Sequence, residues 1–294
     1  MSTAVTVTTF TDPMMGLSYE QEPVYRALET HFGEQLQFRY RMGLLVPDVM
    51  RLVDPHDLSL GEDEAIRRYN TRLAQVYLDE EPIGGLPIVM DDFALFSAEE
   101  RSTLNLCLAY EAALIVEPER ANAYLYALRF ATIVMARRTT RLTVAMDVAR
   151  EEGLDAGALE NCVADGRAGV ALADDLARAR GLGIRGLPAV HVQCGERSEL
   201  VHGLADRAAF VASIDRVSDG AVKPSVPDAT AEGLSSLLGS HPLMSAQEIT
   251  AAFDLDGIDA AEELAAPLVA SGTADMVHVK DGWFLRRQPR PAQL

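Results

Sequence analysis

The sequence has few of the features that mark secreted, metal-binding or nucleic-acid-binding proteins. Its 294 residues contain three cysteines, Cys107, Cys162 and Cys194, which lie far apart and are odd in number. This spacing gives neither a disulfide framework nor a zinc motif, so we expect no metal or other cofactor. Only two lysines occur, and 44 acidic against 26 basic residues leave a formal net charge of −18. Such an excess of negative charge disfavours nucleic acids and anionic membranes as partners.

The sequence also shows no long apolar run and no signal-peptide pattern. No stretch approaches the roughly 18 continuous apolar residues of a membrane span, and residues 4–10 alternate instead of forming the apolar centre of a signal peptide. The expected location is therefore the cytoplasm. An apolar fraction of 48% is sufficient for a large core. A chain of this length favours two domains over one or three.

The first forty residues predict a βαβ unit. Residues 4–10 have the pattern of a buried strand, and residues 36–42 (LQFRYRM) alternate as a second strand. Between them, apolar residues at helical spacing predict a helix over 18–32. Ser18 is the expected N-cap of this helix, and Gln21 completes a capping box. A strand, a helix and a strand this close together indicate a parallel strand pair.

The next part of the chain predicts helices and no convincing strand pair. We expect a helical insertion over about residues 48–152. Start signals, such as Ser97 followed by Glu100, and stop signals, such as Gly153, divide this region into segments. The predicted helices lie at about 62–78, 97–116, 118–136 and 139–152, with shorter ones at 156–164 and 167–180.

The pattern GLGIRGLPAVHV, residues 181–192, marks the return to strands. Turn glycines precede Pro188, and a valine-rich strand follows it. A second strand at 199–204 pairs with the first through the turn near Gly195. Residues 205–217 form a closing helix, which completes the first predicted domain at residue 217.

A small separate unit follows a linker. Residues 218–230 are rich in proline, serine and glycine, which is typical of a linker. The turn Lys280-Asp281-Gly282 indicates a β-hairpin. Three helices precede this hairpin, at about 231–238, 245–253 and 259–271. Three helices and a hairpin are typical of a winged-helix-like α+β domain, which we assign to residues 231–294.

The composition of this unit favours contacts with protein over contacts with DNA. Its third predicted helix, IDAAEELAAPLVASG, is acidic and has small side chains where a DNA-reading helix needs Arg, Lys, Asn or Gln. Residues 225–294 contain ten acidic and four basic residues. We therefore expect a protein partner or a homodimer through this domain, and no nucleic acid.

The order of elements and three short motifs resemble the cytosolic branch of the DsbA family. FTDPMMGLSYEQEP, EEGLD and GIRGLPAV stand in this family's order within residues 4–217. Within this family the sequence resembles FrnE-like proteins and YjbH-type adaptors, with kappa-class glutathione transferases and hydroxychromene-carboxylate isomerases as more distant relatives. The resemblance implies an α/β thioredoxin fold over residues 1–217 with a large helical insertion. It also implies that Pro188 is the family's cis-proline, whose neighbouring backbone pairs with an extended peptide or with glutathione.

The resemblance also identifies what the turn after the first strand lacks. In the redox members this turn is Asp-Pro-x-Cys-x-x-Cys, and the helix N-terminus stabilises the thiolate of the first cysteine. Met15 and Ser18 occupy the two cysteine positions in this chain. A thioether cannot ionise, so the turn is expected to be redox-inactive. Glutathione-using relatives have a serine at the first position, and Met15 departs from that pattern too.

Two functions of different class remain open. The first is an adaptor or accessory protein that binds a peptide or small molecule in a cleft between the Met15 turn, Pro188 and the helical insertion. The second is a non-redox isomerase or tailoring enzyme acting on a peptide or polyketide-like natural product. The expected ligand-binding residues are Met14, Met15, Gly16, Leu17, Tyr19, Leu187 and Pro188. The candidate catalytic residues are Ser18, Glu22 and His191.

Each candidate group also has a purely structural interpretation. Ser18 could simply cap its helix, and Glu22 could be a solvated first-turn charge favoured by the helix dipole. His191 could be a structural histidine on a strand. Cys107 and Cys162 lie in apolar helical patterns and are expected to be inert core thiols. Cys194, which follows the Pro188 strand, could be exposed and reactive.

Overall fold

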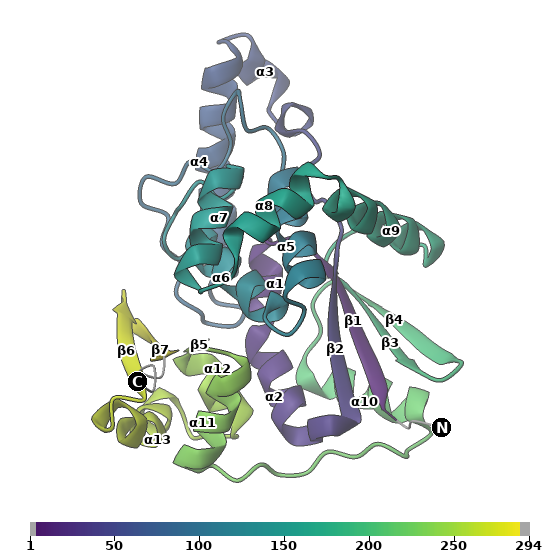
Figure 1. Cartoon of the computed structure of the whole chain (residues 1–294), viewed down its shortest axis with the longest axis vertical. Helices are drawn as coiled ribbons and strands as arrows, with labels where there is room; N and C mark the ends of the chain where they lie inside the picture. The colour runs from purple at the N-terminus through teal and green to yellow at the C-terminus, as the bar shows by residue number, and fades with distance from the viewer. Residues whose placement is uncertain (1–3, 289–294) are drawn as a thin grey trace.

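A four-stranded mixed sheet forms the centre of the computed structural model, which describes residues 4–288 (Figure 1). The strand order is β2-β1-β3-β4, in which β1 is parallel to β2 and antiparallel to β3, and β3 is antiparallel to β4. The strands are β1 (Val5–Thr11), β2 (Leu36–Met42), β3 (Ala189–Cys194) and β4 (Arg197–His202). This is the thioredoxin arrangement that the sequence motifs predict.

Two helices cover one face of this sheet, α2 (Glu22–Phe32) and α10 (Arg207–Ser218). Apolar residues alternate along β1 and β3, so each strand turns one row of side chains into the core. Tyr25 of α2 lies at the centre of this layer. Its ring is 6.0 Å from that of Phe38 on β2 and 6.0 Å from that of Phe210 on α10.

The first predicted helix is divided into two. α1 (Gly16–Glu20) ends at Gln21, and α2 begins beyond it with Pro23 in its first turn. Proline has no N–H group with which to continue the hydrogen bonds of the preceding helix. At this break between the two helices, the side chain of Gln21 accepts a hydrogen bond from Ala205 N (3.2 Å) and donates one to Ala205 O (2.9 Å).

The N-cap prediction for Ser18 is wrong. α1 begins at Gly16, so Ser18 lies inside the helix, and no side-chain cap precedes it. The Ser18 hydroxyl oxygen accepts a hydrogen bond from the Thr11 hydroxyl at 2.7 Å. Because Thr11 is the last residue of β1, this bond joins the helix to the strand before it.

The helical insertion stands above the sheet (Figure 1). Two further helices return the chain to the sheet, where Asp175 accepts hydrogen bonds from Met42 N (2.8 Å) and Arg41 Nη1 (2.5 Å) at the end of β2. None of the helices in residues 4–288 combines the length and the apolar character of a bilayer-spanning segment. The elements between β2 and β3 are η2 (Val49–Arg51), α3 (Pro55–Leu58), α4 (Glu62–Glu80), α5 (Leu104–Val116), α6 (Ala121–Ile133), α7 (Leu142–Glu151), α8 (Ala156–Ala164) and α9 (Arg167–Gly181).

Residues 97–103 are not helical, although the sequence predicts a helix from 97. The backbone of this segment is hydrogen-bonded to the loop after β2. Thr103 N donates to Val46 O (3.0 Å), and Val49 N donates to Arg101 O (2.7 Å). These bonds to a distant segment replace the local bonds of a helix, so α5 begins only after them.

The C-terminal unit has the three helices and the hairpin that the sequence predicts, and also a short strand between the first two helices that the sequence does not predict. Its strands form a second sheet of order β5-β7-β6. This unit has a separate small core, whose buried side chains include Leu234, Met244, Ile249, Trp283 and Leu285. The elements are α11 (Ala231–Ser240), β5 (Leu243–Ser245), α12 (Ala246–Ala252), α13 (Ile258–Ala270), β6 (Ala274–Val279) and β7 (Gly282–Arg287).

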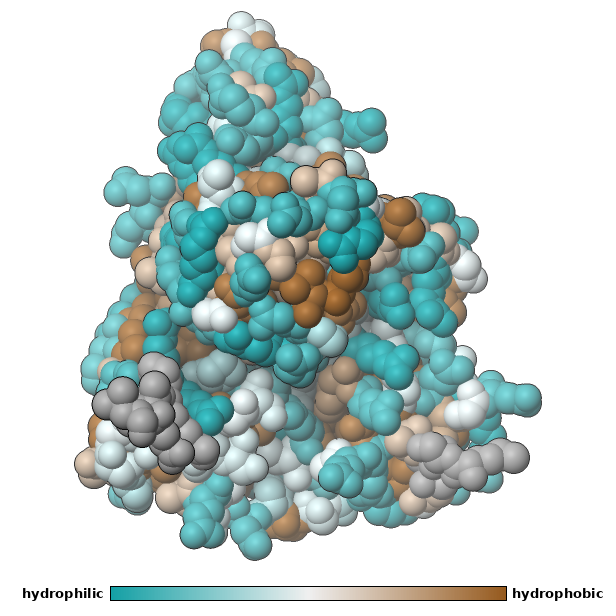
Figure 2. Space-filling view, viewed as in Figure 1, coloured by the Kyte–Doolittle hydropathy of each residue, from teal (hydrophilic) through white to brown (hydrophobic). Residues whose placement is uncertain are grey.

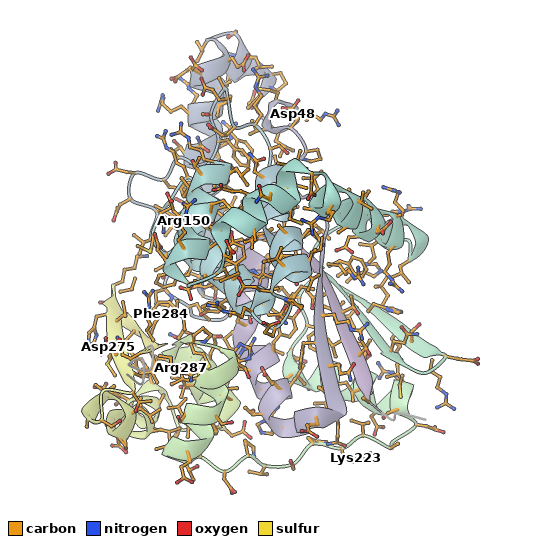
Figure 3. The ribbon with its side chains drawn as sticks, viewed as in Figure 1. Asp48, Arg150, Lys223, Asp275, Phe284 and Arg287 are labelled. Atoms are coloured by element: carbon orange, nitrogen blue, oxygen red, sulfur yellow. The ribbon has the colours of Figure 1, made fainter. Side chains whose placement is uncertain are left out.

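This unit is docked on the thioredoxin part. The Thr30 hydroxyl of α2 donates to Ala252 O (2.5 Å), and His31 Nε2 lies 2.7 Å from Asp254 Oδ2. Phe284 of β7, which is labelled in Figure 3, packs edge-on against Phe130 of α6, with ring centroids 4.9 Å apart. The second domain is therefore held by both α2 and the insertion.

The predicted linker is also attached to the thioredoxin part. Ser225 N donates to His31 O (2.7 Å), and Gln35 Nε2 donates to Lys223 O (2.9 Å). Lys223 lies beneath the sheet in Figure 3, where the chain passes from α10 to α11. The segment joins two domains, but it lies along the end of α2.

Removal of the Phe284 ring should destabilise the whole molecule. We expect Phe284→Ala to lower the free energy of unfolding by about 3–5 kcal/mol, because the ring is fully buried between two domains. Urea denaturation followed by circular dichroism measures the change. Val226→Ala is the control, since this side chain is 84% exposed and its loss should change stability by less than about 0.5 kcal/mol. Equal effects of the two substitutions would contradict a tight interface.

Candidate functional site

The turn between β1 and α1 is held by one buried carboxylate, Asp12. Its Oδ1 accepts from Met14 N (3.1 Å) within the turn. Its Oδ2 accepts from Leu45 N (2.8 Å) and from the Thr103 hydroxyl (2.6 Å). Burial raises the pKa of Asp12, and these hydrogen bonds oppose the rise. The turn is thus fixed to the insertion at its first residue.

Helix α4 covers this turn. Met14 and Met15 are only 2% and 5% exposed. The Tyr77 hydroxyl of α4 donates a hydrogen bond to the carbonyl oxygen of Met14. Gly16 permits the close approach, because a Cβ at this position would lie 2.0 Å from Glu80 Oε2 and 2.7 Å from Tyr77 Cδ1. The insertion therefore shields the position that carries the thiol in the redox members of the resembled family.

The loop after α4 adds to this cover. Glu20 Oε2 accepts from Gly84 N (2.9 Å) and Leu86 N (3.3 Å), and the Tyr19 hydroxyl donates to Pro87 O (3.1 Å). Burial raises the pKa of Glu20 to about 8. The first helix thus holds residues 81–87 in place through one carboxyl group and one phenol.

The Leu187–Pro188 bond is cis, as the sequence predicts. Pro188 is buried at the start of β3, and Leu187 is half-buried. A Cβ on Gly43 would lie 2.4 Å from Leu187 Cδ1, so these two residues pack closely. Of the other expected ligand-binding residues, Tyr19 is buried and Leu17 is half-buried. A ligand at this turn therefore requires α4 or the 81–87 loop to move.

Ser18 and Glu22 are brought together in one buried chain of polar groups. Arg129 of α6 donates through Nη2 to the Thr11 hydroxyl (3.1 Å), which in turn donates to Ser18. Arg129 Nη1 also binds Glu22 Oε1 (2.5 Å), and Arg26 Nη2 binds Glu22 Oε2 (2.9 Å). Glu22 is 2% exposed, so it is not a solvated first-turn charge. Its two oxygens neutralise two buried guanidinium groups.

His191 lies on the opposite face of the sheet. It pairs with Thr8 of β1 and with Leu200 of β4. Because side chains alternate along a strand, Thr8 and His191 face away from Thr11 and the polar chain around it. Burial, with a smaller contribution from Arg178, lowers the pKa of His191. The three catalytic candidates therefore do not converge on one site.

The central residue of this network, Arg129, was missed at the sequence level. Its signal is a single arginine in the apolar helical run YALRFATI, and such a residue indicates a buried ion pair. Glu248 of the C-terminal unit was missed too. Its Oε2 accepts from the Tyr126 hydroxyl (2.5 Å), and its Oε1 lies 3.6 Å from Arg26 Nε. Burial raises the pKa of Glu248.

A cavity of about 690 Å³ opens beside this network. It lies among α2, β2, α6 and α11, and its lining includes Phe38, Tyr40 and Tyr126 together with Arg26 and Arg129. Figure 2 shows the surface hollowed between the C-terminal unit at lower left and the sheet at lower right. Aromatic walls with a few fixed charged groups are typical of ligand pockets.

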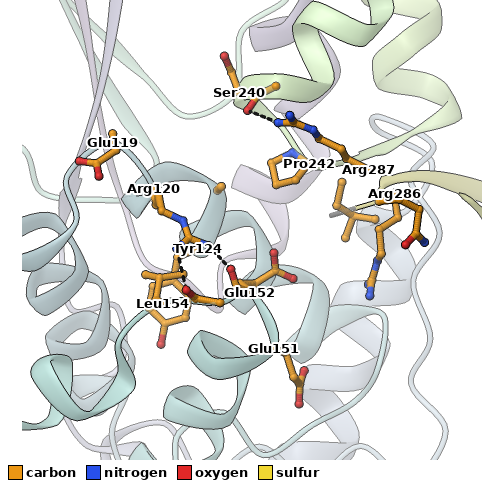
Figure 4. Close-up of a pocket in the computed structure, with 15 residues that line it drawn as sticks. Glu119, Arg120, Tyr124, Glu151, Glu152, Leu154, Ser240, Pro242, Arg286 and Arg287 are labelled. Carbon is orange, nitrogen blue, oxygen red and sulfur yellow. Dashed lines mark hydrogen bonds between the residues drawn. The ribbon is translucent and has the colours of Figure 1, made fainter. Parts of the chain in front are cut away.

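A second cavity, of about 720 Å³, lies between the insertion and the C-terminal unit (Figure 4). Arg120 and Arg287 line it, and both guanidinium groups bind backbone carbonyls. Arg120 Nη1 donates to Gly153 O (2.7 Å), and Arg287 Nη1 donates to Gly239 O (3.4 Å). These arginines therefore brace loop ends, so this cavity is the weaker candidate for ligand binding.

The prediction of buried thiols is confirmed for Cys107 and Cys162. Cys107 Sγ donates to Asp12 Oδ2 (3.5 Å), and burial together with the Asp12 charge raises the pKa of this thiol well above its usual value. Cys194 is half-buried at the end of β3. Within residues 4–288, no group of three or more His, Cys, Asp or Glu side chains is arranged to hold a metal ion.

Comparisons with known proteins agree with this fold. A model of the thioredoxin family matches residues 8–209. A putative protein disulfide isomerase from Nitrosomonas europaea is similar in structure, with a TM-score of 0.57 and 16% identity over 74% of this chain and 96% of that chain. No curated protein sequence matches the chain.

Two further solved structures are similar at comparable levels. The cytosolic disulfide reductase DsbM from Pseudomonas aeruginosa has a TM-score of 0.52 and 20% identity, covering 73% of this chain and 95% of its own. A probable DsbA oxidoreductase from Streptomyces coelicolor has a TM-score of 0.53 and 19% identity, covering 75% and 92%. At such identities the similarity establishes the fold alone.

The high pKa of Glu20 predicts a pH-dependent stability. The folded-state pKa of about 8 exceeds the ordinary value of 4.5, so the protonated group favours the fold. This contribution is complete below pH 4.5 and is lost as the pH rises through 8. In this window the wild type should lose up to about 1.4 kcal/mol of unfolding free energy per pH unit through this group. In Glu20→Gln this contribution to the slope should be missing, whereas the contributions of Glu80, Glu111 and Glu248, whose pKa values burial also raises, should remain.

Urea denaturation at about pH 5, 6.5 and 8, three values that span the titration of Glu20, measures this slope. Glu232→Gln, at an exposed position of α11, is the matched control and should keep the wild-type slope. Identical slopes in the wild type and in Glu20→Gln would show that Glu20 is not the titrating group.

Proposed function

Because the chain belongs to the thioredoxin family, we propose that it is a cytoplasmic DsbA-like protein that does not exchange disulfides. It binds a peptide or a small molecule instead, as an adaptor or accessory protein. The observation that carries this proposal is the turn after β1, where Met15 and Ser18 occupy the two thiol positions and both are buried. Neither side chain can form a thiolate, which is the nucleophile in disulfide exchange.

The three cysteines elsewhere do not compensate for this loss. Cys107 and Cys162 are completely buried, and the raised pKa of Cys107 keeps it protonated. Cys194 lies at the far end of β3 from Pro188, six positions further along the chain, which corresponds to about 20 Å of extended strand. A thiol at that distance cannot attack a disulfide bound beside the cis-proline.

The cavity between α2, β2, α6 and α11, which we call the polar cavity, supports ligand binding. Its volume of about 690 Å³ is within the roughly 300–1,000 Å³ of small-molecule sites. Phe38, Tyr40 and Tyr126 offer apolar and aromatic contact surface. The Met15 turn is shielded by α4, so ligand binding there would need a displacement that binding at this cavity does not.

The alternative, an isomerase or tailoring enzyme for a natural product, has less support. Ser18 and Glu22 are fully occupied in the chain of bonds with Thr11 and Arg129. His191 lies on the other face of the sheet, so no acid–base pair is assembled from the three candidates. An adaptor or accessory role is therefore the one we adopt.

We further propose that the winged-helix-like C-terminal unit serves protein contacts. Its α12 is packed on α2, while its acidic α13 carries Asp259, Glu262 and Glu263 on the surface. This charge disfavours DNA as a ligand. A protein partner or a second copy of the chain remains the predicted occupant of the exposed surface.

An insulin-reduction assay tests the absence of redox chemistry. With dithiothreitol as the electron source, the wild-type protein should precipitate insulin no faster than buffer alone, because no solvent-accessible dithiol exists at the turn. Turbidity at about 650 nm follows the precipitation of insulin. The initial rate with the wild-type protein should be on the order of the rate without any protein catalyst. A rate equal to that of a disulfide oxidoreductase measured in parallel would overturn the proposal.

A second test restores the thiols. Met15→Cys combined with Ser18→Cys creates the Cys-x-x-Cys pattern, but the α4 cover should keep its insulin-reduction rate low. Adding Tyr77→Ala, which removes the hydroxyl that binds the turn, should raise that rate by about tenfold or more. Tyr69→Ala is the matched control on α4, because Tyr69 packs on Phe96 instead. If the two tyrosine variants react at equal rates, α4 is not the cover.

A further inference from the structure

β2 leaves one side of the sheet open. It is an edge strand, with no strand beyond it in residues 4–288 (Figure 1). Gly43 N donates inward to Thr11 O (2.7 Å), whereas Met42 N donates outward to Asp175 Oδ2 (2.8 Å). Because successive residues of a strand alternate in direction, the N–H and C=O groups of Phe38 and Tyr40 also point outward.

These four backbone groups have no hydrogen-bond partner within the described chain. The strand end above them is closed by Asp175, and the end below is closed by a turn in which Leu36 N bonds to Gly33 O. Between these closures lies a short stretch of open strand edge. An edge of this kind is a template for pairing with another extended chain.

The open edge borders the polar cavity. Phe38 and Tyr40 line that cavity together with Leu125 and Tyr126 of α6. A chain paired with β2 would direct alternate side chains toward this space, since residues of neighbouring strands share a face. The backbone edge and the cavity therefore form one continuous site for an extended ligand.

Unpaired charge at the cavity mouth is negative. Glu34 and Glu119 line the cavity and are exposed, and neither takes part in an ion pair within residues 4–288. The arginines of the cavity are already neutralised: Arg129 binds Glu22, and Arg26 binds Glu22 and Glu29. A ligand approaching the mouth therefore meets carboxylates that lack a counter-ion.

We propose that an extended basic peptide binds this site by adding a strand to the outer edge of β2. The inference rests on the proposed function and narrows its ligand to a peptide. Backbone hydrogen bonds form with Phe38 and Tyr40, and lysine or arginine side chains on the cavity side meet Glu34 and Glu119. On the other face of the sheet the peptide passes the exposed Arg39, which favours a neutral or acidic residue there.

The test uses two capped octapeptides, one alternating valine and lysine and one alternating valine and glutamate. Binding to the full chain is measured by fluorescence anisotropy, and hydrogen exchange of the backbone amides is followed by NMR. The lysine peptide should bind and slow exchange at the Phe38 and Tyr40 amides by about tenfold or more. The glutamate peptide should not bind, and added salt should weaken the lysine complex.

Two pairs of variants separate backbone pairing from side-chain contact. Phe38→Pro removes the outward N–H at an edge position, where proline is tolerated, and should weaken binding about tenfold. Phe38→Leu keeps the N–H and should bind nearly as the wild type does. Glu34→Lys with Glu119→Lys should exchange the preference to the glutamate peptide. Glu262→Lys with Glu263→Lys on α13, outside the cavity, is the charge-matched control and should leave the preference unchanged.

Three outcomes would overturn the inference. Protection centred on Pro188 would move the peptide to the turn and leave the proposed function intact. Protection of the β2 amides without peptide, with a dimer in sedimentation, would make a second copy of the chain the occupant. If the lysine peptide does not bind, an extended basic peptide is not the ligand of this site. Failure of the proposed function itself is distinguishable, because that appears as insulin reduction and not as a change at β2.

Discussion

The buried pairing of Arg129 with Glu22 is the interaction on which most of the structure depends. A guanidinium group removed from water is tolerated only when carboxylates and hydrogen-bond acceptors surround it. Here α2 supplies Glu22, β1 supplies Thr11, and Arg26 extends the network to Glu248 of the C-terminal unit. Sheet, insertion and second domain thus share one set of charges. Removal of any of the three would expose a buried charged group or leave it without its partner.

The thioredoxin turn has become a packing element in this molecule. In the redox members of the resembled family the residues at the start of the first helix are reserved for chemistry. Here Asp12 joins them to the insertion, Tyr77 binds the Met14 carbonyl, and Gly16 lets α4 approach at close range. The same backbone geometry that can activate a thiol serves as an anchor for a helix, and the cavity that we propose for ligand binding lies elsewhere, among α2, β2, α6 and α11.

Local patterns predicted the parts of the fold that depend on neighbouring residues. Alternation located β1 and β2 to within one residue, whereas the cis-proline was implied by the resemblance to the DsbA family. The sequence could not reveal why Ser18 and Glu22 are buried, because Arg129, which binds Glu22 directly and Ser18 only through Thr11, lies 107 residues beyond Glu22. The prediction of a helix from residue 97 was wrong for the same reason, since backbone hydrogen bonds of residues 97–103 go to the distant loop after β2. The open edge of β2 follows from strand order, which periodicity does not contain.

Because the C-terminal unit docks on the thioredoxin part, the buried network is completed only late in synthesis. At about 5–20 residues per second, the residues after 217 take roughly 4–15 s to leave the ribosome. During that interval the emerging thioredoxin part already holds Arg26 and Tyr126, whereas Glu248, 122 residues after Tyr126, has yet to arrive. Until then a solvated gap remains beside α2. A chain that ends before Glu248 would therefore leave Arg26 and Tyr126 without this partner, and Phe130 without the Phe284 ring that packs on it.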